Sequence, residues 1–296
     1  MELIGFIGIG IMGKPMSINL MKAGYELMAY DINPVSLKDL STKGAKIASS
    51  IKEVTNNCKV IIIMLPDSPE SEMVIIGKEG IINFAKKGTI VIDMSSIDPI
   101  VSIKIGKKLA AKGIDFLDAP VSGGEPKAVD GTLAIMIGGK EEIFQKVLPL
   151  FKVIGSLYTL VGDIGAGNFA KLSNQIIVAI NIAAVSEALM LAEKAGLSPT
   201  KIFNAIRGGL AGSAVLESKV PMIINKDFKP GFKIKLHKKD IQNVLHAGSA
   251  LNVPLLLTAQ LLEIFKSLIS QGYSDLDHSA IYKFYENMSE KNKEFI

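Results

Sequence analysis

Residues 162–196, GDIGAGNFAKLSNQIIVAINIAAVSEALMLAEKAG, open on glycines, carry one lysine early and then run apolar almost without interruption. This pattern predicts one long helix. At about 100° per residue, apolar side chains fall on every side of it, so we expect the helix to be buried inside the protein. It is a poor candidate for a membrane span because it also carries two serines and the polar side chains of Asn174, Gln175, Asn181 and Glu187.

Lys171 is the unusual residue of this stretch, because no carboxylate lies three or four positions away to pair with it on the helix surface. One interpretation is a lysine whose ammonium reaches water from the first turns of the helix. The other is a desolvated lysine that serves as a general acid, with Asn174 and Gln175 beside it on the same face. We favour the second, in which the helix holds one ammonium at a binding cleft.

Composition sets broad limits on the protein class. The chain has 296 residues, of which 48% are hydrophobic and 21% charged, which is enough to bury the cores of two medium domains. We place the domains at residues 1–162 and 163–296. The net charge of +4 is mild and the lysines are scattered, so no nucleic-acid partner is expected.

Cysteine content and the first residues bear on the compartment. A single cysteine, Cys58, excludes an internal disulfide and a thiolate zinc site, which favours a reducing environment. The start MELIGFIG has no basic region before its apolar run, so no signal peptide is expected. We therefore expect a cytoplasmic protein with no membrane partner, and no cluster of metal ligands is evident.

The N-terminal stretch has the pattern of a dinucleotide-binding turn. Apolar residues 3–7 predict a strand, a helical pattern follows to about residue 24, and between them stand Gly8, Ile9, Gly10, Ile11, Met12 and Gly13. In this GxGxxG spacing the first glycine allows a tight turn and the second lets backbone approach a pyrophosphate. The third packs helix on strand, with the helix N-terminus facing the phosphates.

Asp31 strengthens the dinucleotide interpretation. It closes a second predicted strand, residues 26–30, near the spacing at which a carboxylate binds the ribose 2′-hydroxyl. The alternative is an ordinary turn residue before Pro34. No arginine follows Asp31, and a carboxylate here repels a 2′-phosphate, so we expect NAD, with NADP as the alternative.

Strands and helices continue to alternate up to residue 162, which predicts an α/β fold with a Rossmann-like, doubly wound, mostly parallel sheet. Further strands are expected at residues 60–65, 89–93, 115–118, 132–137 and 157–161. Ligands bind at the carboxyl ends of such strands, so Leu65, Pro66 and Ser96 are expected near the nicotinamide. Asp98 and Pro99 form a good start for a helix.

A glycine pair follows the strand predicted at residues 115–118. Ser122, Gly123 and Gly124 present backbone N–H groups that suit a carboxylate or a phosphate, although a plain glycine turn has the same sequence. After residue 162 the pattern becomes wholly helical, with helices expected at 198–207, 236–250, 254–271 and 278–290. The roles of Phe232, Lys238, Lys239 and Asp240 stay open at this stage, and His237, His246 and His278 form no motif.

Four stretches in this order resemble the β-hydroxyacid dehydrogenase family: GFIGIGIMGKPM (5–16), DAPVSGGEPKAVDGTLAIMIGG (118–139), GAGNFAKLSNQ (165–175) and LHKKD (236–240). The resemblance covers nearly the whole chain. It implies an N-terminal Rossmann domain, an all-helical C-terminal domain joined by the long helix, and a homodimer or homotetramer associated through the helical domain.

The resemblance also implies roles for single residues. It makes Lys171 the catalytic lysine and Ser122, Gly123 and Gly124 the cradle of the substrate carboxylate. It puts Ser96 and Lys239 on the cofactor side, with Phe232 and Asp240 beside them. Many members carry an asparagine four residues after the lysine, where this chain has Gln175 preceded by Asn174, so either amide is a candidate for substrate contact.

The expected reaction is hydride transfer between NADH and a small semialdehyde, with Lys171 protonating the alkoxide that forms. The motifs GGEPKAVDGTL and IRGGLAGS are most similar to members that reduce tartronate semialdehyde to glycerate. Members that act on 3-hydroxyisobutyrate share every motif and are the alternative, as are other short-chain semialdehyde reductases. A dinucleotide-binding sensor without turnover is a further alternative, against which the intact Lys171 and Ser122 argue.

Overall fold

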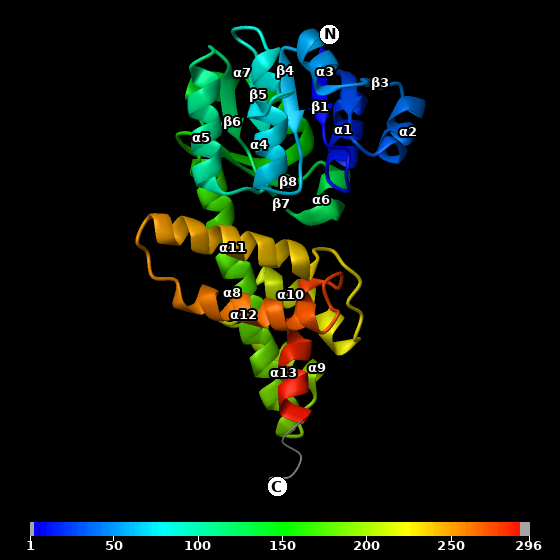
Figure 1. Cartoon of the computed structure of the whole chain (residues 1–296). Coiled ribbons are helices and arrows are strands. Elements are labelled where there is room, and N and C mark those ends of the chain that lie inside the picture. Colours follow the sequence, from blue (N-terminus) through cyan, green and yellow to red (C-terminus); the bar gives the residue numbers. More distant parts are fainter. Residues whose placement is uncertain (1–2, 291–296) are drawn as a thin grey trace. The chain divides into compact units, whose positions relative to one another are not determined.

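The computed structural model describes residues 3–290, and the chain divides into two compact units at residues 171 and 172 (Figure 1). The first unit, residues 1–171, contains the sheet. The second, residues 172–296, is helical throughout its described part. The boundary falls inside the longest helix, α8 (Ala166–Lys194), so Lys171 is the last residue of the first unit.

The strands of the first unit form one sheet, in the order β3-β2-β1-β4-β5-β6-β8-β7 with β9 beside β8. The strands are β1 (Leu3–Ile7), β2 (Glu26–Tyr30), β3 (Lys46–Ile47), β4 (Val60–Ile63), β5 (Ile90–Asp93), β6 (Asp115–Asp118), β7 (Val121–Ser122), β8 (Leu133–Gly138) and β9 (Gly155–Gly162). The pairs from β3 across to β6 are parallel, while β8 is antiparallel to both β6 and β7. The prediction of a doubly wound, mostly parallel sheet is confirmed.

Helices cover both faces of this sheet, and each face has its own apolar core. One core draws on α1 (Gly13–Lys22), α2 (Pro34–Thr42), α6 (Gly124–Asp130) and α7 (Glu141–Ile154). The other draws on α3 (Ile51–Asn57), α4 (Ser68–Ile76), η1 (Ile81–Asn83) and α5 (Pro99–Ala110). Successive β4 residues alternate between the two cores, as the pleat of a strand requires: Ile62 packs in the first and Ile61 and Ile63 in the second.

Local sequence explains where several helices begin. Asp98 accepts a hydrogen bond of 2.8 Å from the Ile100 N–H, and Pro99 occupies the first helical position of α5, as its sequence predicted. Asn33 caps α2 in the same way through the Val35 N–H at 3.1 Å. The carboxyl ends of β2 and β5 are therefore followed by capped helix starts, at the edge of the sheet where ligands bind in such folds.

The second unit packs its helices around one apolar core that includes Ile182, Leu189, Ile241 and Phe265. Its elements after α8 are α9 (Pro199–Ile206), α10 (Ala214–Ile224), α11 (Ile234–Ala250), α12 (Leu256–Ser270), η2 (His278–Ala280) and α13 (Ile281–Glu290). The helices expected from periodicity are all present within a few residues of their predicted ends.

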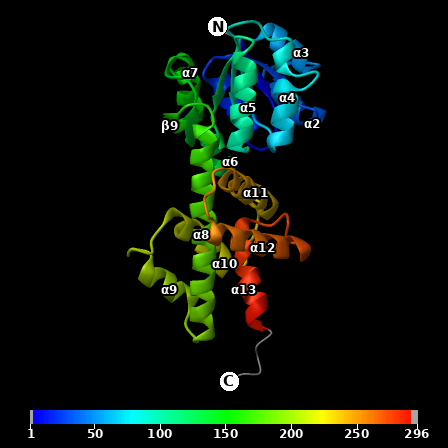
Figure 2. The ribbon, with the colours of Figure 1, turned by 60° about the vertical axis from the view of Figure 1, so that its left-hand side comes forward.

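α8 is one unbroken helix, as predicted, but the expectation of burial on every side is wrong for a single chain (Figure 2). Ile177 is 61% exposed and Leu191 is 74% exposed, whereas Ala179, Ile182 and Leu189 lie in the core. Periodicity shows that a face is apolar but does not show what covers it. Only one face of α8 finds partners within its own chain.

By length and composition α8 also meets the criteria for a membrane-spanning helix, with half of its most apolar window buried in the protein. Core helices of soluble proteins meet the same criteria. Asn168, Gln175 and Ser186 are buried along it and hydrogen-bonded to protein groups. These observations agree with a core helix.

Candidate functional site

In the glycine turn after β1, close backbone contacts require glycine at two of the three positions, and the third leaves open space. Gly8 has a φ of +96°, and a Cβ there would meet the Met64 carbonyl oxygen at 2.2 Å. At Gly13 a Cβ would meet the Gly8 carbonyl oxygen at 2.0 Å, so the helix can approach the strand this closely only with glycine. A Cβ at Gly10 would meet nothing within 4 Å, which leaves open space over the turn.

The N-terminus of α1 faces this turn without a side chain to cap it. Met12 makes no capping hydrogen bond, and the first turn of α1 contains no acidic residue. The partial positive charge of a helix N-terminus is therefore available to an anion above Gly10. Ile9, Ile11 and Met12 complete the turn, in which Ile9 is buried and Ile11 is 60% exposed.

Asp31 is tied to the glycine turn. Its carboxylate accepts a 2.6 Å hydrogen bond from the Ile9 N–H and a 2.7 Å hydrogen bond from the Asn33 N–H. The carboxylate is half-buried, and the next residue, Ile32, is 90% exposed. The fold thus holds an acidic acceptor at the end of β2, beside the turn, with no cation at the next two positions.

Three residues of the predicted cofactor side follow β4 and β5, which are neighbours in the sheet. Leu65 and Pro66 follow β4, and the Leu65 N–H donates to the Ser95 hydroxyl at 2.8 Å. Ser96 follows β5 and is half-buried. This hydrogen bond joins the two turns, so the structure brings Leu65, Pro66 and Ser96 to one edge of the sheet.

Ser122, Gly123 and Gly124 form the turn from β7 into α6. Ser122 ends β7, paired with Ala134 of β8, and is half-buried. Gly123 and Gly124 both have positive φ values, +136° and +68°, which other residues rarely adopt. Glycine is therefore needed for the shape of this turn.

The first turn of α8 is fastened to the end of β6. The Asp118 carboxylate accepts hydrogen bonds of 2.7 Å from the backbone N–H groups of Gly165 and Asn168. Asn168 in turn accepts from the Ile97 N–H at 3.0 Å and donates to the Ser102 hydroxyl at 3.1 Å. At Gly167 a Cβ would meet the Asp118 carbonyl oxygen at 2.4 Å, so helix and strand touch through backbone.

Lys171 lies one helical turn after Asn168 and is only 7% exposed. This burial favours the interpretation as a desolvated lysine over the one in which the ammonium extends into water. The Asn168 side chain accepts a hydrogen bond from the Ile97 N–H, and Asn168 and Lys171 lie on the same face of α8. This face therefore contacts the loop of Ser96 and Ile97. The glycine turn, the Ser122 turn and Lys171 all belong to the first unit.

The remaining predicted residues gather in the second unit. Gln175 donates a 2.5 Å hydrogen bond to Asp240 Oδ2, and the Lys239 ammonium lies 2.9 Å from Asp240 Oδ1. The Asn174 amide donates to Gln175 Oε1 at 2.9 Å. Gln175 and Asp240 are buried while Asn174 is half-buried, so Gln175 is the amide fixed in place.

Phe232 lies against His237 and His278, two histidines to which the sequence assigned no motif. Its ring centroid is 5.6 Å from that of His237 and 5.5 Å from that of His278. The Phe232 N–H donates to the buried carboxylate of Asp277 at 3.0 Å. Asp277 also binds the Lys219 ammonium at 3.0 Å, which makes a partly buried ion pair next to the histidines.

Sequence reasoning also missed two buried carboxylates, Asp93 and Asp118, which lie opposite each other at the ends of β5 and β6. Burial raises the pKa of Asp93 to about 6, and the neighbouring Asp118 adds to this while the Ser95 hydrogen bonds oppose it. Burial likewise raises the pKa of Asp118, against the hydrogen bonds from Gly165 and Asn168. The sequence signal that could have identified these carboxylates is an acidic residue at the end of a strand predicted to lie in the core.

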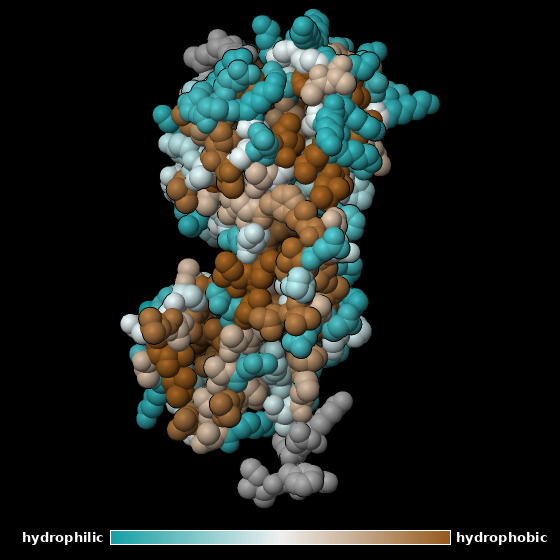
Figure 3. Space-filling view, turned by 90° about the vertical axis from the view of Figure 1, so that its left-hand side faces the viewer, coloured by the Kyte–Doolittle hydropathy of each residue, from teal (hydrophilic) through white to brown (hydrophobic). Residues whose placement is uncertain are grey.

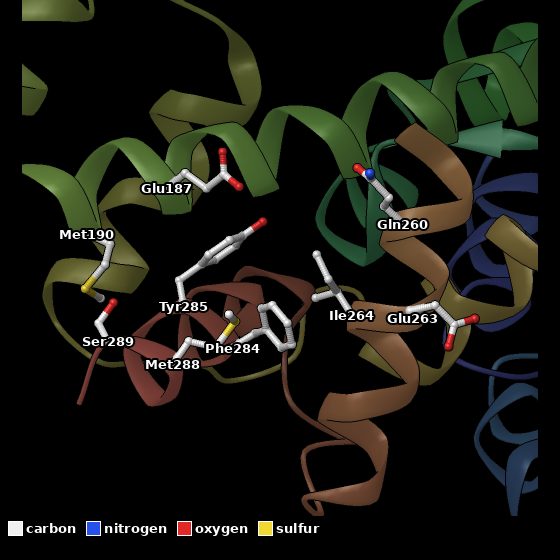
Figure 4. Close-up of a pocket in the computed structure, with 9 residues that line it drawn as sticks. All are labelled: Glu187, Met190, Gln260, Glu263, Ile264, Phe284, Tyr285, Met288 and Ser289. Atoms are coloured by element: carbon white, nitrogen blue, oxygen red, sulfur yellow. The ribbon is translucent and has the colours of Figure 1, made fainter. Parts of the chain in front are cut away.

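A pocket of about 740 Å³ opens in the second unit (Figure 4). It is lined by Glu187, Met190, Gln260, Glu263, Ile264, Phe284, Tyr285, Met288 and Ser289. Burial raises the pKa of Tyr285, and the Glu187 carboxylate, which accepts from its hydroxyl, raises it further. None of the residues predicted for the reaction lines this pocket.

The first unit fits a dinucleotide on three counts: the open space above Gly10, the uncapped start of α1 and the fixed carboxylate of Asp31. Among residues 3–290, no three His, Cys, Asp or Glu side chains are grouped as metal ligands.

Comparison with known proteins identifies both parts of the chain. Residues 3–162 match the NAD binding domain of 6-phosphogluconate dehydrogenase, and residues 165–285 match the NAD-binding family of NADP-dependent 3-hydroxyisobutyrate dehydrogenase. The chain is 46% identical to 2-hydroxy-3-oxopropionate reductase of Escherichia coli, over 97% of this chain and 98% of that protein. It is 39% identical to 2-(hydroxymethyl)glutarate dehydrogenase of Eubacterium barkeri, over 97% and 95% of the two chains.

A solved structure agrees with these relatives. The 3-hydroxyisobutyrate dehydrogenase of Mycobacterium tuberculosis, solved with L-serine, matches with a TM-score of 0.88 at 30% identity, over 96% of this chain and 98% of that one. The relatives are named as reductases or dehydrogenases. The chain is therefore an NAD(P)-binding oxidoreductase that acts on a CH–OH group.

Proposed function

The chain belongs to the β-hydroxyacid dehydrogenase family, and on this premise we propose that it reduces tartronate semialdehyde (2-hydroxy-3-oxopropanoate) to glycerate with NADH. The observation that carries the proposal is Lys171, a buried lysine on a helix whose start is hydrogen-bonded to the edge of the sheet. The 46% identity to a 2-hydroxy-3-oxopropionate reductase supports the choice of substrate.

Lys171 is proposed as the general acid. When bound, a nicotinamide would supply the hydride, and the carbonyl oxygen of the substrate would then become an alkoxide. An ammonium beside that oxygen stabilises the negative charge as it develops and then donates the proton. A positioned general acid contributes about 10²- to 10⁴-fold in rate. Burial favours this role because charge interactions are stronger away from water.

Ser122, Gly123 and Gly124 are proposed to hold the substrate carboxylate. The two left-handed glycines turn the backbone between β7 and α6, and the Ser122 hydroxyl ends the strand beside them. Backbone N–H groups in such a turn form an anion-binding concavity. L-serine, the compound solved with the M. tuberculosis relative, is itself a 3-hydroxy acid, which supports a carboxylate as the constant part of the ligand.

The proposed cofactor is NADH rather than NADPH. Gly8 to Gly13 would carry the pyrophosphate, Asp31 the adenosine ribose, and Leu65, Pro66 and Ser96 the nicotinamide side. The Asp31 carboxylate accepts from Ile9 and Asn33, which keeps it beside the glycine turn, where it would repel a 2′-phosphate. Phe232, Lys239 and Asp240 are proposed for the cofactor side on family resemblance, and Asn174 and Gln175 for the substrate.

A 3-hydroxyisobutyrate dehydrogenase is the second candidate, because the matched M. tuberculosis structure has that activity in its name. The two substrates differ in a hydroxyl and a methyl group. A site built to hydrogen-bond the hydroxyl rejects the methyl analogue strongly, because its buried polar groups are left without partners. The 46% identity to a 2-hydroxy-3-oxopropionate reductase favours the hydroxyl-bearing substrate.

The deciding experiment is a panel of tartronate semialdehyde, methylmalonate semialdehyde, succinate semialdehyde and glyoxylate, assayed with NADH and with NADPH. We expect tartronate semialdehyde with NADH to give the highest kcat/KM. A higher kcat/KM for methylmalonate semialdehyde would replace the proposal with its second candidate.

We further propose that the chain forms a cytoplasmic homodimer or homotetramer through its helical part. Hydrophobic side chains reach the surface there (Figure 3), among them Ile177, Leu191 and Met288 at 61%, 74% and 58% exposed. Exposed apolar groups of this kind mark association surfaces. Light scattering measures the oligomeric state directly, and a monomer at micromolar concentration would contradict this part of the proposal.

A further inference from the structure

Two histidines of the second unit meet ring to ring. His237 of α11 is fully buried and His278 of η2 is 6% exposed. Their Nδ1 atoms lie 2.9 Å apart, which is hydrogen-bond distance. They come from elements 41 residues apart in sequence, so only the folded chain pairs them.

The partners of the pair assign its protons. His237 Nε2 lies 3.3 Å from the backbone carbonyl oxygen of Gln175, and a carbonyl only accepts, so His237 Nε2 carries hydrogen. With both rings neutral, His237 Nδ1 is then the acceptor and His278 Nδ1 is the donor. The contact between the two Nδ1 atoms holds a single hydrogen. The pair therefore binds two protons when neutral and three when charged, and a fourth would break the contact.

The third proton belongs on His278 Nε2, which lies 4.0 Å from Asp277 Oδ1. Burial raises the pKa of Asp277, but the neighbouring charges of His278 and Lys219 outweigh burial, so the net pKa lies below its ordinary value. An ionised Asp277 carboxylate favours a positive charge on His278. The other elements packed on the pair bring Phe265 from α12 and Gln175 from α8. Asp240 lies one turn after His237 on α11, where it accepts a hydrogen bond from Gln175 and forms an ion pair with Lys239.

Asp277 connects this proton to Phe232. Its Oδ2 accepts 3.0 Å hydrogen bonds from the N–H groups of Gly231 and Phe232, while its Oδ1 accepts from the Ser279 N–H at 2.9 Å. The Phe232 ring itself packs edge-on against both imidazoles. An imidazolium at His278 would compete with the Phe232 N–H for the Asp277 carboxylate.

We propose that the His237–His278 pair is a one-proton positioning unit for Phe232, and that uptake of its third proton weakens binding of the nicotinamide cofactor. The inference rests on the proposed placement of Phe232 on the cofactor side. His237 and His278 act through Phe232 and Asp277 and are positioning residues rather than catalytic ones.

The test is the affinity for NAD⁺, measured by calorimetry on the full chain, which needs no semialdehyde turnover. Between about pH 8 and about pH 5.5, on either side of the ordinary histidine pKa of about 6.5, we expect the Kd to rise about threefold or more. In His278→Asn the amide nitrogen replaces the Nδ1 donor but does not titrate, so the ratio of the two Kd values should fall close to one. His246→Asn, an exposed histidine on the same helix α11, is the matched control and should keep the wild-type ratio.

The proposal is overturned if the Kd of the unmodified chain for NAD⁺ does not change with pH. It is also overturned if the ratio of the Kd values at about pH 5.5 and about pH 8 is the same in His278→Asn as in the wild type. If His278→Asn does not fold, ¹⁵N-histidine NMR of the unmodified chain decides. The proposal requires the two rings to share one titration and to take up a single proton, and independent titration of each ring contradicts it. Neither measurement uses a semialdehyde, so failure of the proposed reductase activity is recognised separately, in the substrate panel.

Discussion

Asp118 accepts a 2.7 Å hydrogen bond from the backbone N–H of Asn168, and this contact fixes the start of α8 at the end of β6. The same carboxylate accepts a 2.7 Å hydrogen bond from the Gly165 N–H, so it satisfies two of the N–H groups that a helix start leaves without partners. Lys171 follows one turn later. The position of the lysine is thus set from the sheet by a buried carboxylate.

Asp118→Asn tests this link. An amide has one oxygen to accept with and presents N–H groups to the second donor, so one helix N–H loses its partner. We expect the free energy of unfolding to fall by about 1–3 kcal/mol and kcat to fall about tenfold or more as Lys171 loses its fixed position. Asp115→Asn, at the start of the same strand, is the control and should change both quantities little. Wild-type kcat in a less stable Asp118→Asn would limit Asp118 to a role in stability.

Asp93 should make the folded protein less stable as the pH rises, whereas most carboxyl groups in folded proteins have the opposite effect. Its pKa is raised from 3.8 to about 6 in the folded chain, so the folded state binds this proton more tightly than the unfolded state. The free energy of unfolding should therefore fall as the pH rises from about 4 to about 6, by on the order of 3 kcal/mol from this group. Denaturant unfolding of Asp93→Asn should lack this component, while exposed Asp130→Asn keeps it. Identical pH profiles for Asp93→Asn and the wild type would contradict the assignment.

Lys171 is tested by two substitutions. Lys171→Met removes the charge and the proton but keeps most of the length, so kcat should fall about 10²-fold or more with little change in NADH affinity. Lys171→Arg keeps a charge but holds its proton far more tightly, so it should restore little activity. Lys194→Met, at the exposed end of α8, is the control. Near-full activity of Lys171→Met in a folded, NADH-binding protein would remove the lysine from the mechanism, whereas near-full activity of Lys171→Arg would leave it an electrostatic role.

Ser122→Ala should raise the KM for the acid substrate more than it alters NADH affinity, because its hydroxyl is proposed to face the carboxylate. The loss of one hydrogen bond to a charged group predicts an increase of about ten- to a hundredfold. Exposed Ser156→Ala in β9 provides the comparison. An unchanged KM would mean that the Gly123 and Gly124 backbone holds the carboxylate alone or that it binds elsewhere.

Asp31→Ser with Ile32→Arg should shift the preference from NADH toward NADPH, since it replaces a carboxylate with a hydroxyl and adds a guanidinium for the 2′-phosphate. Serine also keeps an acceptor for the Ile9 N–H. Val35→Arg adds the same charge at another exposed position and should leave the preference unchanged. Equal kcat/KM values for the two cofactors in the unmodified enzyme would show that Asp31 does not select between them.

The sequence by itself determined the elements whose signals are local. β1, β2 and β6 occur at their predicted residues, because short apolar runs bounded by glycine or aspartate leave few alternatives. The Gly8, Gly10 and Gly13 spacing implied a turn in which backbone replaces side chains, and the distances at those glycines agree with it. The Asp98 and Pro99 start of α5 was equally readable, because a cap acts within one turn of its own helix.

Only the tertiary structure decided what those elements meet. Asp118 and Asn168 are 50 residues apart, and His237 and His278 are 41 apart, so no periodicity within one helix or strand could pair them. The exposure of Ile177 and Leu191 has the same origin, since an apolar pattern fixes which face of α8 seeks a partner but not whether its own chain supplies one. Periodicity reports the free-energy preference of a segment, whereas hydrogen-bond partners and burial depend on which segments the fold brings together.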